Sequence, residues 1–344
     1  SGGAIFAIKD VTVNGTDFIN NTAKLSGGAV CSDTGIISTT NGKFINNTAG
    51  VQGGAIISKN NYVTTNGTEF IGNKVNSTTE NTSGGAIFAR GIVNTTNSKF
   101  VNNSASATDD NTAFGGAIYS GSDITSNASE FENNTAKTGG ALYSYITITT
   151  IGGKFNGNNA TSTSGGAIFA NNNITVKGTD FNNNFANVTG GAIYSLNGTI
   201  SSTNAIFENN TANTAGGAIS ANQTVITNGS NFTGNKVNST DGTGGAIFSN
   251  TNVTAYNSTF TDNNATKFGG AIFTNNHDST INVTKSTFTD NTATTSGGAI
   301  YSNGNVAVED STLTNNTATD AAGGAIFANS IDNLIIVNFT NNTA

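Results

Sequence analysis

Acidic, basic and imidazole side chains are the groups in this sequence that could catalyse a reaction, and they are sparse. Seven charged residues share one recurring position, directly before a repeated Phe: Asp17, Glu69, Glu130, Asp180, Lys43, Lys99 and Lys154. Acid–base or glycosidic chemistry needs an acid and a base, or two carboxylates, held at close range. A position that accepts either sign of charge is instead typical of a solvated surface.

The single histidine, His277, and the single cysteine, Cys31, are equally isolated. Metal sites and activated nucleophiles need several such groups together, and a disulfide needs a second cysteine. We therefore expect no enzyme activity, no metal site and no cofactor. The net charge is −7 and Arg90 is the only arginine, so nucleic acid is not expected as a partner, because phosphate binding needs a basic surface.

Asparagine offers the one covalent chemistry that the sequence supports widely. Asn-x-Ser/Thr sequons, the acceptors of N-linked glycans in secreted proteins, occur throughout the chain. A composition this rich in Asn and Thr also creates sequons by chance. Seven sequons share one recurring corner that should face outward, where glycans would form a line along one edge: Asn20, Asn46, Asn102, Asn133, Asn209, Asn315 and Asn341.

These residues recur because the chain is a tandem repeat. A Gly-Gly-Ala triplet occurs thirteen times, and each is followed by an apolar residue with Asn three positions beyond it. The apolar residue is Phe in twelve repeats and Leu313 in the other. A period of about 27 residues that runs through the whole chain indicates a repeat array. We expect one continuous domain over residues 1–344, which is a fragment of a longer array.

Apolar residues within each repeat are two apart, which is the period of a β-strand. The strand before Phe carries residues such as Val11 and Val13, and the strand after Gly-Gly-Ala carries residues such as Ile5. Gly, Asn or Asp dominate three positions before Phe and are the only residues two positions after it. These residue types accept the left-handed backbone of a tight corner. Each repeat is predicted to hold three short strands and three bends, without a helix.

Stacked repeats of this kind predict an all-β, single-stranded parallel β-helix of about thirteen coils. Coils about 4.8 Å apart would bring equivalent residues into columns, and the general rule for parallel crossovers makes the helix right-handed. The Asn column after Phe should hydrogen-bond from coil to coil and satisfy a buried corner. Its members are Asn21, Asn47, Asn73, Asn103, Asn134, Asn158, Asn184, Asn210, Asn235, Asn263, Asn291, Asn316 and Asn342.

A column of aromatic residues follows the inward-facing Ile, and alternation places it outside. Its members are Phe6, Phe88, Tyr119, Tyr143, Phe169, Tyr194, Phe248, Phe273, Tyr301 and Phe327. An exposed stripe of this kind could bind a partner, a sugar or a neighbouring copy. A stacked column could instead stabilise only its own sheet. A third alternative exchanges the inside and outside of this strand, because the invariant Ala would also suit a crowded interior.

The paired motifs resemble a known family. Gly-Gly-Ala followed by Ile, Val or Leu occurs in all thirteen repeats, and Phe-x-x-Asn occurs in twelve. This pair resembles the repeat of the chlamydial polymorphic outer-membrane proteins and the adhesin-like repeats of methanogenic archaea. Segments 20–23 and 258–263 are closer to the archaeal group. The resemblance implies a cell-surface right-handed β-helix that is used in adhesion, and it supplies no catalytic residues.

The sequence therefore favours a non-enzymatic, extracellular adhesin or structural stalk at the cell surface. Its partner would be a cell-surface protein or a glycan. The alternative is a subunit of a self-assembling filament or sheath that binds copies of itself end to end or laterally, because uncapped strand edges pair with other chains. Apolar runs such as Ala4–Ile8 and Leu334–Val337 are too short to span a bilayer, so we expect no membrane insertion by this segment.

Overall fold

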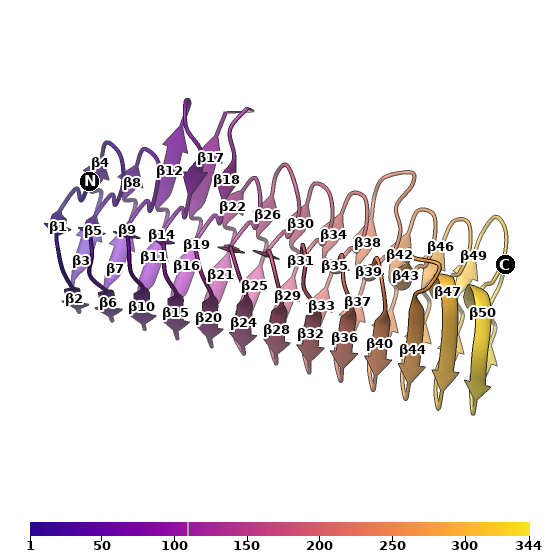
Figure 1. Cartoon of the computed structure of the whole chain (residues 1–344). Helices are drawn as coiled ribbons and strands as arrows, with labels where there is room; N and C mark the ends of the chain where they lie inside the picture. The colour runs from indigo at the N-terminus through magenta and orange to yellow at the C-terminus, as the bar shows by residue number, and fades with distance from the viewer. Residues whose placement is uncertain (109) are drawn as a thin grey trace. The chain divides into compact units, whose positions relative to one another are not determined.

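The computed structural model describes residues 1–108 and 110–344, and within these ranges the regular structure consists of β-strands alone. The chain divides into two compact units, Ser1–Asn171 and Asn172–Ala344, which are built in the same way. In each unit the strands of successive repeats pair in parallel, as Figure 1 shows. The predicted all-β parallel β-helix of about thirteen coils is confirmed. No helix of the described ranges is long and apolar enough to cross a membrane.

Most coils contain four short strands. In the first coil they are β1 (Ile5–Ala7), β2 (Val11–Asn14), β3 (Asp17–Ile19) and β4 (Thr22–Ala23). The strands equivalent to β1 and β2 belong to one sheet, and those equivalent to β3 and to β4 form two others. The three predicted strands correspond to β1, β2 and β3. The two-residue β4 was not predicted, because two residues are too few to show a period.

The second unit repeats the same coil. One example is β31 (Ile193–Ser195), β32 (Ile200–Thr203), β33 (Ile206–Glu208) and β34 (Thr211–Ala212). Further along this unit, β47 (Ile300–Glu309) and β50 (Ile326–Ile335) are ten residues long and run through both positions of the first sheet.

The register places identical residues above one another. β3 pairs with β7 (Lys43–Ile45) so that Phe18 lies opposite Phe44, and their rings stack with centroids 4.8 Å apart and planes 8° apart. This spacing is the ordinary distance between neighbouring strands, so the rings can stack without bending the backbone. Phe44 is fully buried, as are its equivalents up to Phe288. The Phe column therefore forms a continuous apolar core within each unit.

The Gly-Gly pair exists because two backbones approach closely at this bend. The first glycine of one pair, Gly190, has a φ of 64°, and a Cβ there would meet the carbonyl of Ile193. A Cβ on the second, Gly191, would meet the carbonyl of Gly217 in the next coil and would lie 2.6 Å from the backbone of Thr211. The other pairs have equivalent contacts. Any side chain at the second glycine would therefore push neighbouring coils apart.

Both predicted corners are left-handed in all thirteen coils. Every residue three positions before the Phe column and two positions after it has a positive φ. Most of these residues are Gly, Asn or Asp, which tolerate this backbone best. The exceptions at the first corner are Ala128 with a φ of 47°, Lys285 with 50° and Ile336 with 54°. The position in the coil, rather than the local residue type, fixes the backbone at these three sites.

Two insertions in the first unit extend the coil at one bend. They lengthen β12 (Lys74–Ser77) and β17 (Ser104–Ala107) and add a small pair of strands, β13 (Thr82–Ser83) and β18 (Ala113–Phe114), which project at the upper side of Figure 1. The pair is parallel, with Ser83 opposite Phe114.

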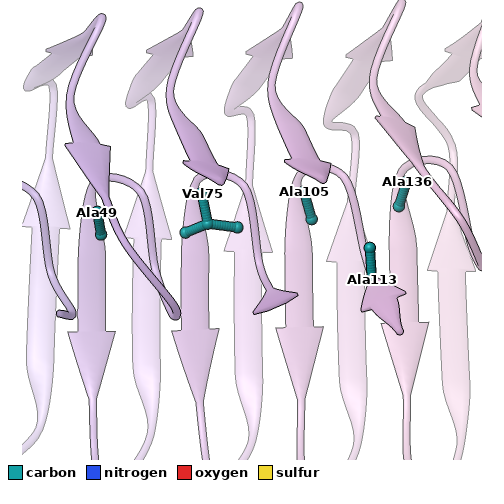
Figure 2. Close-up of a cluster of buried hydrophobic side chains, with 5 residues drawn as sticks. All are labelled: Ala49, Val75, Ala105, Ala113 and Ala136. Atoms are coloured by element: carbon teal, nitrogen blue, oxygen red, sulfur yellow. The ribbon is translucent and has the colours of Figure 1, made fainter. Parts of the chain in front are cut away.

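A buried apolar cluster anchors the second insertion. Ala113 is fully buried against small residues of the β4-type strands, as Figure 2 shows. The cluster consists of Ala49, Val75, Ala105, Ala113 and Ala136. Since side chains alternate along a strand, burial of Ala113 directs its neighbour Phe114 to the opposite face of β18. This orientation brings the Phe114 ring to within 4.5 Å of the Tyr143 ring.

Candidate functional site

Within each unit the Asn column forms a hydrogen-bond ladder, which we call the Asn ladder. The Asn47 backbone N–H and its Nδ2 both donate to Oδ1 of Asn73, at 3.0 and 2.9 Å. Its Nδ2 also donates to the Phe18 carbonyl at 2.9 Å. Its own Oδ1 accepts the corresponding two bonds from Asn21. Asn47 is fully buried, so the ladder satisfies every polar group of a carboxamide that water cannot reach.

A second buried ladder uses hydroxyl groups and was not predicted. The Thr65 Oγ1 lies 3.0 Å from the Ser98 Oγ of the next coil, and the backbone N–H of Thr68 donates to the same Oγ at 3.2 Å. Thr95 and Ser129 repeat this arrangement one coil further on. The sequence signal was present, because Ser or Thr recurs two positions before Phe in most repeats. These hydroxyls stabilise the first corner, and their hydrogen-bonding groups are occupied by contacts between coils.

The seven candidate glycan acceptors lie where a glycan could be attached. All seven side chains are exposed, and each backbone has a positive φ, from 51° at Asn341 to 58° at Asn20. The corner column also contains glycine: a Cβ on Gly72 would lie close to the Asn46 Oδ1 of the preceding coil. The corner side chains thus lean along the stack. Whether they carry glycans remains a prediction.

The charged column before Phe is ordered by the register. In the first unit, successive coils place Asp17 opposite Lys43, Lys43 opposite Glu69, and Glu69 opposite Lys99. Ion pairs follow, with Lys43 Nζ 3.7 Å from Glu69 and Lys99 Nζ 3.6 Å from Glu130. The side chains are about half exposed, so each pair contributes little to stability, about 0–1 kcal/mol. The column is an alternating surface array and keeps like charges apart.

The aromatic column is a stack of rings that is less exposed than alternation predicted. Phe88 and Tyr119 stack at 4.9 Å with planes 2° apart, and Tyr119 and Tyr143 stack at 5.3 Å with planes 5° apart. Phe6 is 54% exposed, but Tyr143 is only 7% exposed. The stripe is therefore only partly exposed, and its role in partner binding or in stabilising its own sheet stays a prediction.

The positions that interrupt this column, which strand alternation would also place outside, are buried too. Cys31, Ile57 and Ser220 are at most 1% exposed. The physical reason is a neighbouring column, formed by the residue directly before each Gly-Gly pair, that lies beside the rings. Its members are joined by single parallel bridges, such as Ser26 to Gln52 and Gln52 to Ser83.

Phe114 and Phe268 place an additional ring in this neighbouring column. The Phe114 ring lies 4.5 Å from Tyr143 and 6.4 Å from Tyr119, tilted by about 40°. Phe268 repeats the geometry in the second unit, with its ring 4.5 Å from Tyr301.

A groove follows the aromatic column in the first unit. Two adjoining cavities, of about 330 and 350 Å³, share Gln52, Phe88 and Arg90 in their walls. The second is also lined by Phe114 and Tyr119. The groove therefore combines ring edges, an amide and the only guanidinium of the chain, and this combination was not predicted. The varied residue before each Gly-Gly pair was its only signal in the sequence.

Burial sets the titration of the groups near the groove. It raises the pKa of Tyr143 to about 12 and also raises the pKa of Tyr119, which the positive charge of Arg90 lowers in part. Burial likewise raises the pKa of the Cys31 thiol, so this thiol is a poor nucleophile. His277 is exposed. Within residues 1–108 and 110–344, no three His, Cys, Asp or Glu residues are grouped closely enough to hold a metal ion.

The columns, corners and ladders define a β-solenoid repeat protein. Six of its segments match the model of the Chlamydia polymorphic membrane protein repeat: residues 15–33, 128–145, 178–196, 204–222, 257–275 and 285–303. Each segment starts at a left-handed corner and contains the Phe, Asn and Gly-Gly-Ala positions of one coil. The resemblance of the paired motifs to the chlamydial repeat is thereby confirmed. No curated protein and no solved structure matches the chain.

Proposed function

We propose that this chain is a non-enzymatic part of an extracellular adhesin or structural stalk at a cell surface. The observation that carries the proposal is the match of six solenoid segments to the repeat of a membrane protein family. The repeated residues support it as well, because the Phe column, the Asn ladder and the Gly-Gly bend serve the stacking of coils. Recognition would then depend on residues that differ between coils.

Binding arrays test the adhesin role. The labelled full chain is applied to arrays of glycans and of cell-surface proteins, and an adhesin should give saturable binding to at least one class. An absence of binding to every array member would refute adhesion and leave the stalk. Antibody labelling of intact cells of the source organism tests the location, since a surface protein is labelled without permeabilisation.

N-glycans on the outward corner form part of the same proposal. The seven exposed Asn residues support it, and the intact mass of protein from its natural source measures the glycan load. Asn209→Gln should then remove the mass of one glycan. An intact mass equal to that of the bare polypeptide would refute glycosylation.

A filament or sheath is the second candidate, because strands that pair in parallel from coil to coil could continue the same pairing with another copy of the chain. Electron micrographs of the native protein at micromolar concentration should show filaments if this is so. Single rods at every concentration would exclude it.

A further inference from the structure

We propose that the groove beside the aromatic column of the first unit binds a uronic-acid oligosaccharide, that is, a sugar chain bearing carboxylates. The groove comprises the walls of the two adjoining cavities, from Gln52 to Tyr145. This inference deepens the adhesin proposal and rests on it, because it names the class of ligand.

The wall shared by the two cavities carries a positive charge from Arg90. Arg90 is exposed, and within the residues that the structure describes no carboxylate lies at ion-pair distance from its guanidinium. A chain with a net charge of −7 thus places its only guanidinium in the wall shared by both cavities. A planar guanidinium matches the two oxygens of a carboxylate and forms two parallel hydrogen bonds with it.

Ring orientation is the second argument. Phe88, Tyr119 and Tyr143 stack face to face, with planes within 5° of parallel, so they turn their edges outward. The edge of an aromatic ring carries positive potential and the face negative potential. Phe114, which Ala113 orients, lines the groove with a tilted ring. Ring edges beside a guanidinium therefore favour an anionic ligand over a neutral one.

The remaining lining favours a sugar over a peptide. Gln52, Asn60 and Tyr145 add amide and hydroxyl groups that hydrogen-bond to sugar hydroxyls. A peptide that bound by adding a strand to the sheet would need free backbone partners. The backbone here is already used between coils; for example, the Gly84 N–H donates to the Phe114 carbonyl at 2.9 Å. Recognition must therefore rely on side chains alone.

The dimensions suit more than one sugar ring. The lining spans four successive coils, from Gln52 through Ser83 and Phe114 to Tyr145, which corresponds to about 14 Å along the stack at ordinary strand spacing. The larger cavity, at about 350 Å³, is within the size range of small-molecule sites.

Calorimetric titration of the full chain tests the proposal. The probe is a tetrasaccharide of alternating glucuronic acid and N-acetylglucosamine, compared with its carboxyl methyl ester and with hexaglutamate. The wild type should bind the acidic sugar and neither comparator. Arg90→Gln should weaken binding at least about tenfold, Arg90→Lys should weaken it less, and Phe114→Ser should also weaken it.

The matched control is Phe268→Ser, which removes the equivalent ring in the second unit and should leave binding unchanged. Three results would overturn the proposal: equal binding of the ester, tighter binding of hexaglutamate, or wild-type affinity in Arg90→Gln. Absence of tetrasaccharide binding overturns it as well. The binding arrays separate the two proposals, because adhesion without tetrasaccharide binding refutes only the ligand class.

Discussion

Alanine at the second glycine of a Gly-Gly pair should be far more destabilising than alanine at a corner glycine of the same coil. Gly191 and Gly178 provide the comparison. At Gly191 the added Cβ would meet the Gly217 carbonyl and lie 2.6 Å from Thr211, and both are backbone groups that cannot rotate away. At Gly178 no atom lies within 4 Å of the added Cβ, and only the φ of 55° is unfavourable.

The magnitudes follow from these surroundings. Relieving the collision at Gly191 means separating two coils, which breaks the bonds from the N–H groups of Gly190, Gly191 and Ala192 to the next coil, at 2.9–3.1 Å. Each buried group left without a partner costs about 1–3 kcal/mol, so the three groups together make Gly191→Ala cost roughly 3–9 kcal/mol. Gly178→Ala should cost about 1 kcal/mol, because a left-handed backbone disfavours alanine. Alanine also lowers the conformational entropy of the unfolded chain, which offsets part of this cost.

Urea unfolding followed by far-UV circular dichroism measures both variants. Amide hydrogen exchange adds the location, because a solenoid can open at a single coil without unfolding elsewhere. Gly191→Ala should lower the unfolding midpoint and deprotect the amides of residues 190–219. Equal midpoints for the two variants would refute the role assigned to the Gly-Gly bend.

The remaining predictions concern the ladder, the corners, the charged column and the aromatic column. Asn210→Asp places a carboxyl group beside two hydrogen-bond acceptors, which raises the pKa of that carboxyl group. The free energy of unfolding should therefore fall as the pH rises from about 4, measured by urea unfolding at each pH. A loss that does not depend on pH would contradict the ladder. Ala128→Gly relieves a left-handed alanine and should raise the free energy of unfolding by up to about 1 kcal/mol; a decrease would mean that the corner is unstrained. Lys99→Glu should lower the free energy of unfolding by about 1 kcal/mol at low salt and by less at 1 M salt, measured by urea unfolding. Lys177 lies opposite a threonine, so Lys177→Glu should lower it by less than Lys99→Glu does at low salt. Equal losses for the two variants would contradict the role of the alternating charges. The wild type should lose stability relative to Tyr143→Phe between pH 10 and 12, because burial raises the pKa of Tyr143 to about 12 in the folded state; parallel pH profiles would argue against this burial.

The sequence predicted the parts of the fold that recur in every coil. Alignment on Phe located the Phe column and the Asn ladder, and it located both left-handed corners even where the local residue argued against one. Ile336 is β-branched and would not be placed at a φ of 54° on its own merits. Its position relative to Phe339 gives the correct answer, since thirteen coils share one backbone path.

The parts that vary from coil to coil could not be predicted in this way. The residue before Gly-Gly is Ser26, Gln52, Ser83 or Phe114 in successive coils, so it has no shared chemistry from which to infer a shared location. The column that these residues form lies beside the aromatic column and lines the groove. Alternation along one strand indicates which face a side chain takes, but burial depends on neighbouring segments that this pattern does not describe.

The charged column could be predicted from the sequence only in part. The alternating signs of Asp17, Lys43, Glu69, Lys99 and Glu130 were legible once the coils were aligned. Their meaning required the register, which places consecutive members opposite each other. For the seven sequons, the structure gives the exposure and the backbone geometry. The attachment of glycans depends on enzymes other than this chain.

The central feature of this molecule is that the Gly-Gly-Ala and Phe-x-x-Asn positions of every coil are committed to contacts between coils. Native-state amide hydrogen exchange of the full chain tests this most directly. The amides of the second glycine and of the Asn ladder should exchange slowly in the inner coils of both units, and the insertions at 76–81 should exchange fast. Exchange of ladder amides as fast as that of the insertions, in either unit, would contradict the assignment of these residues to the scaffold.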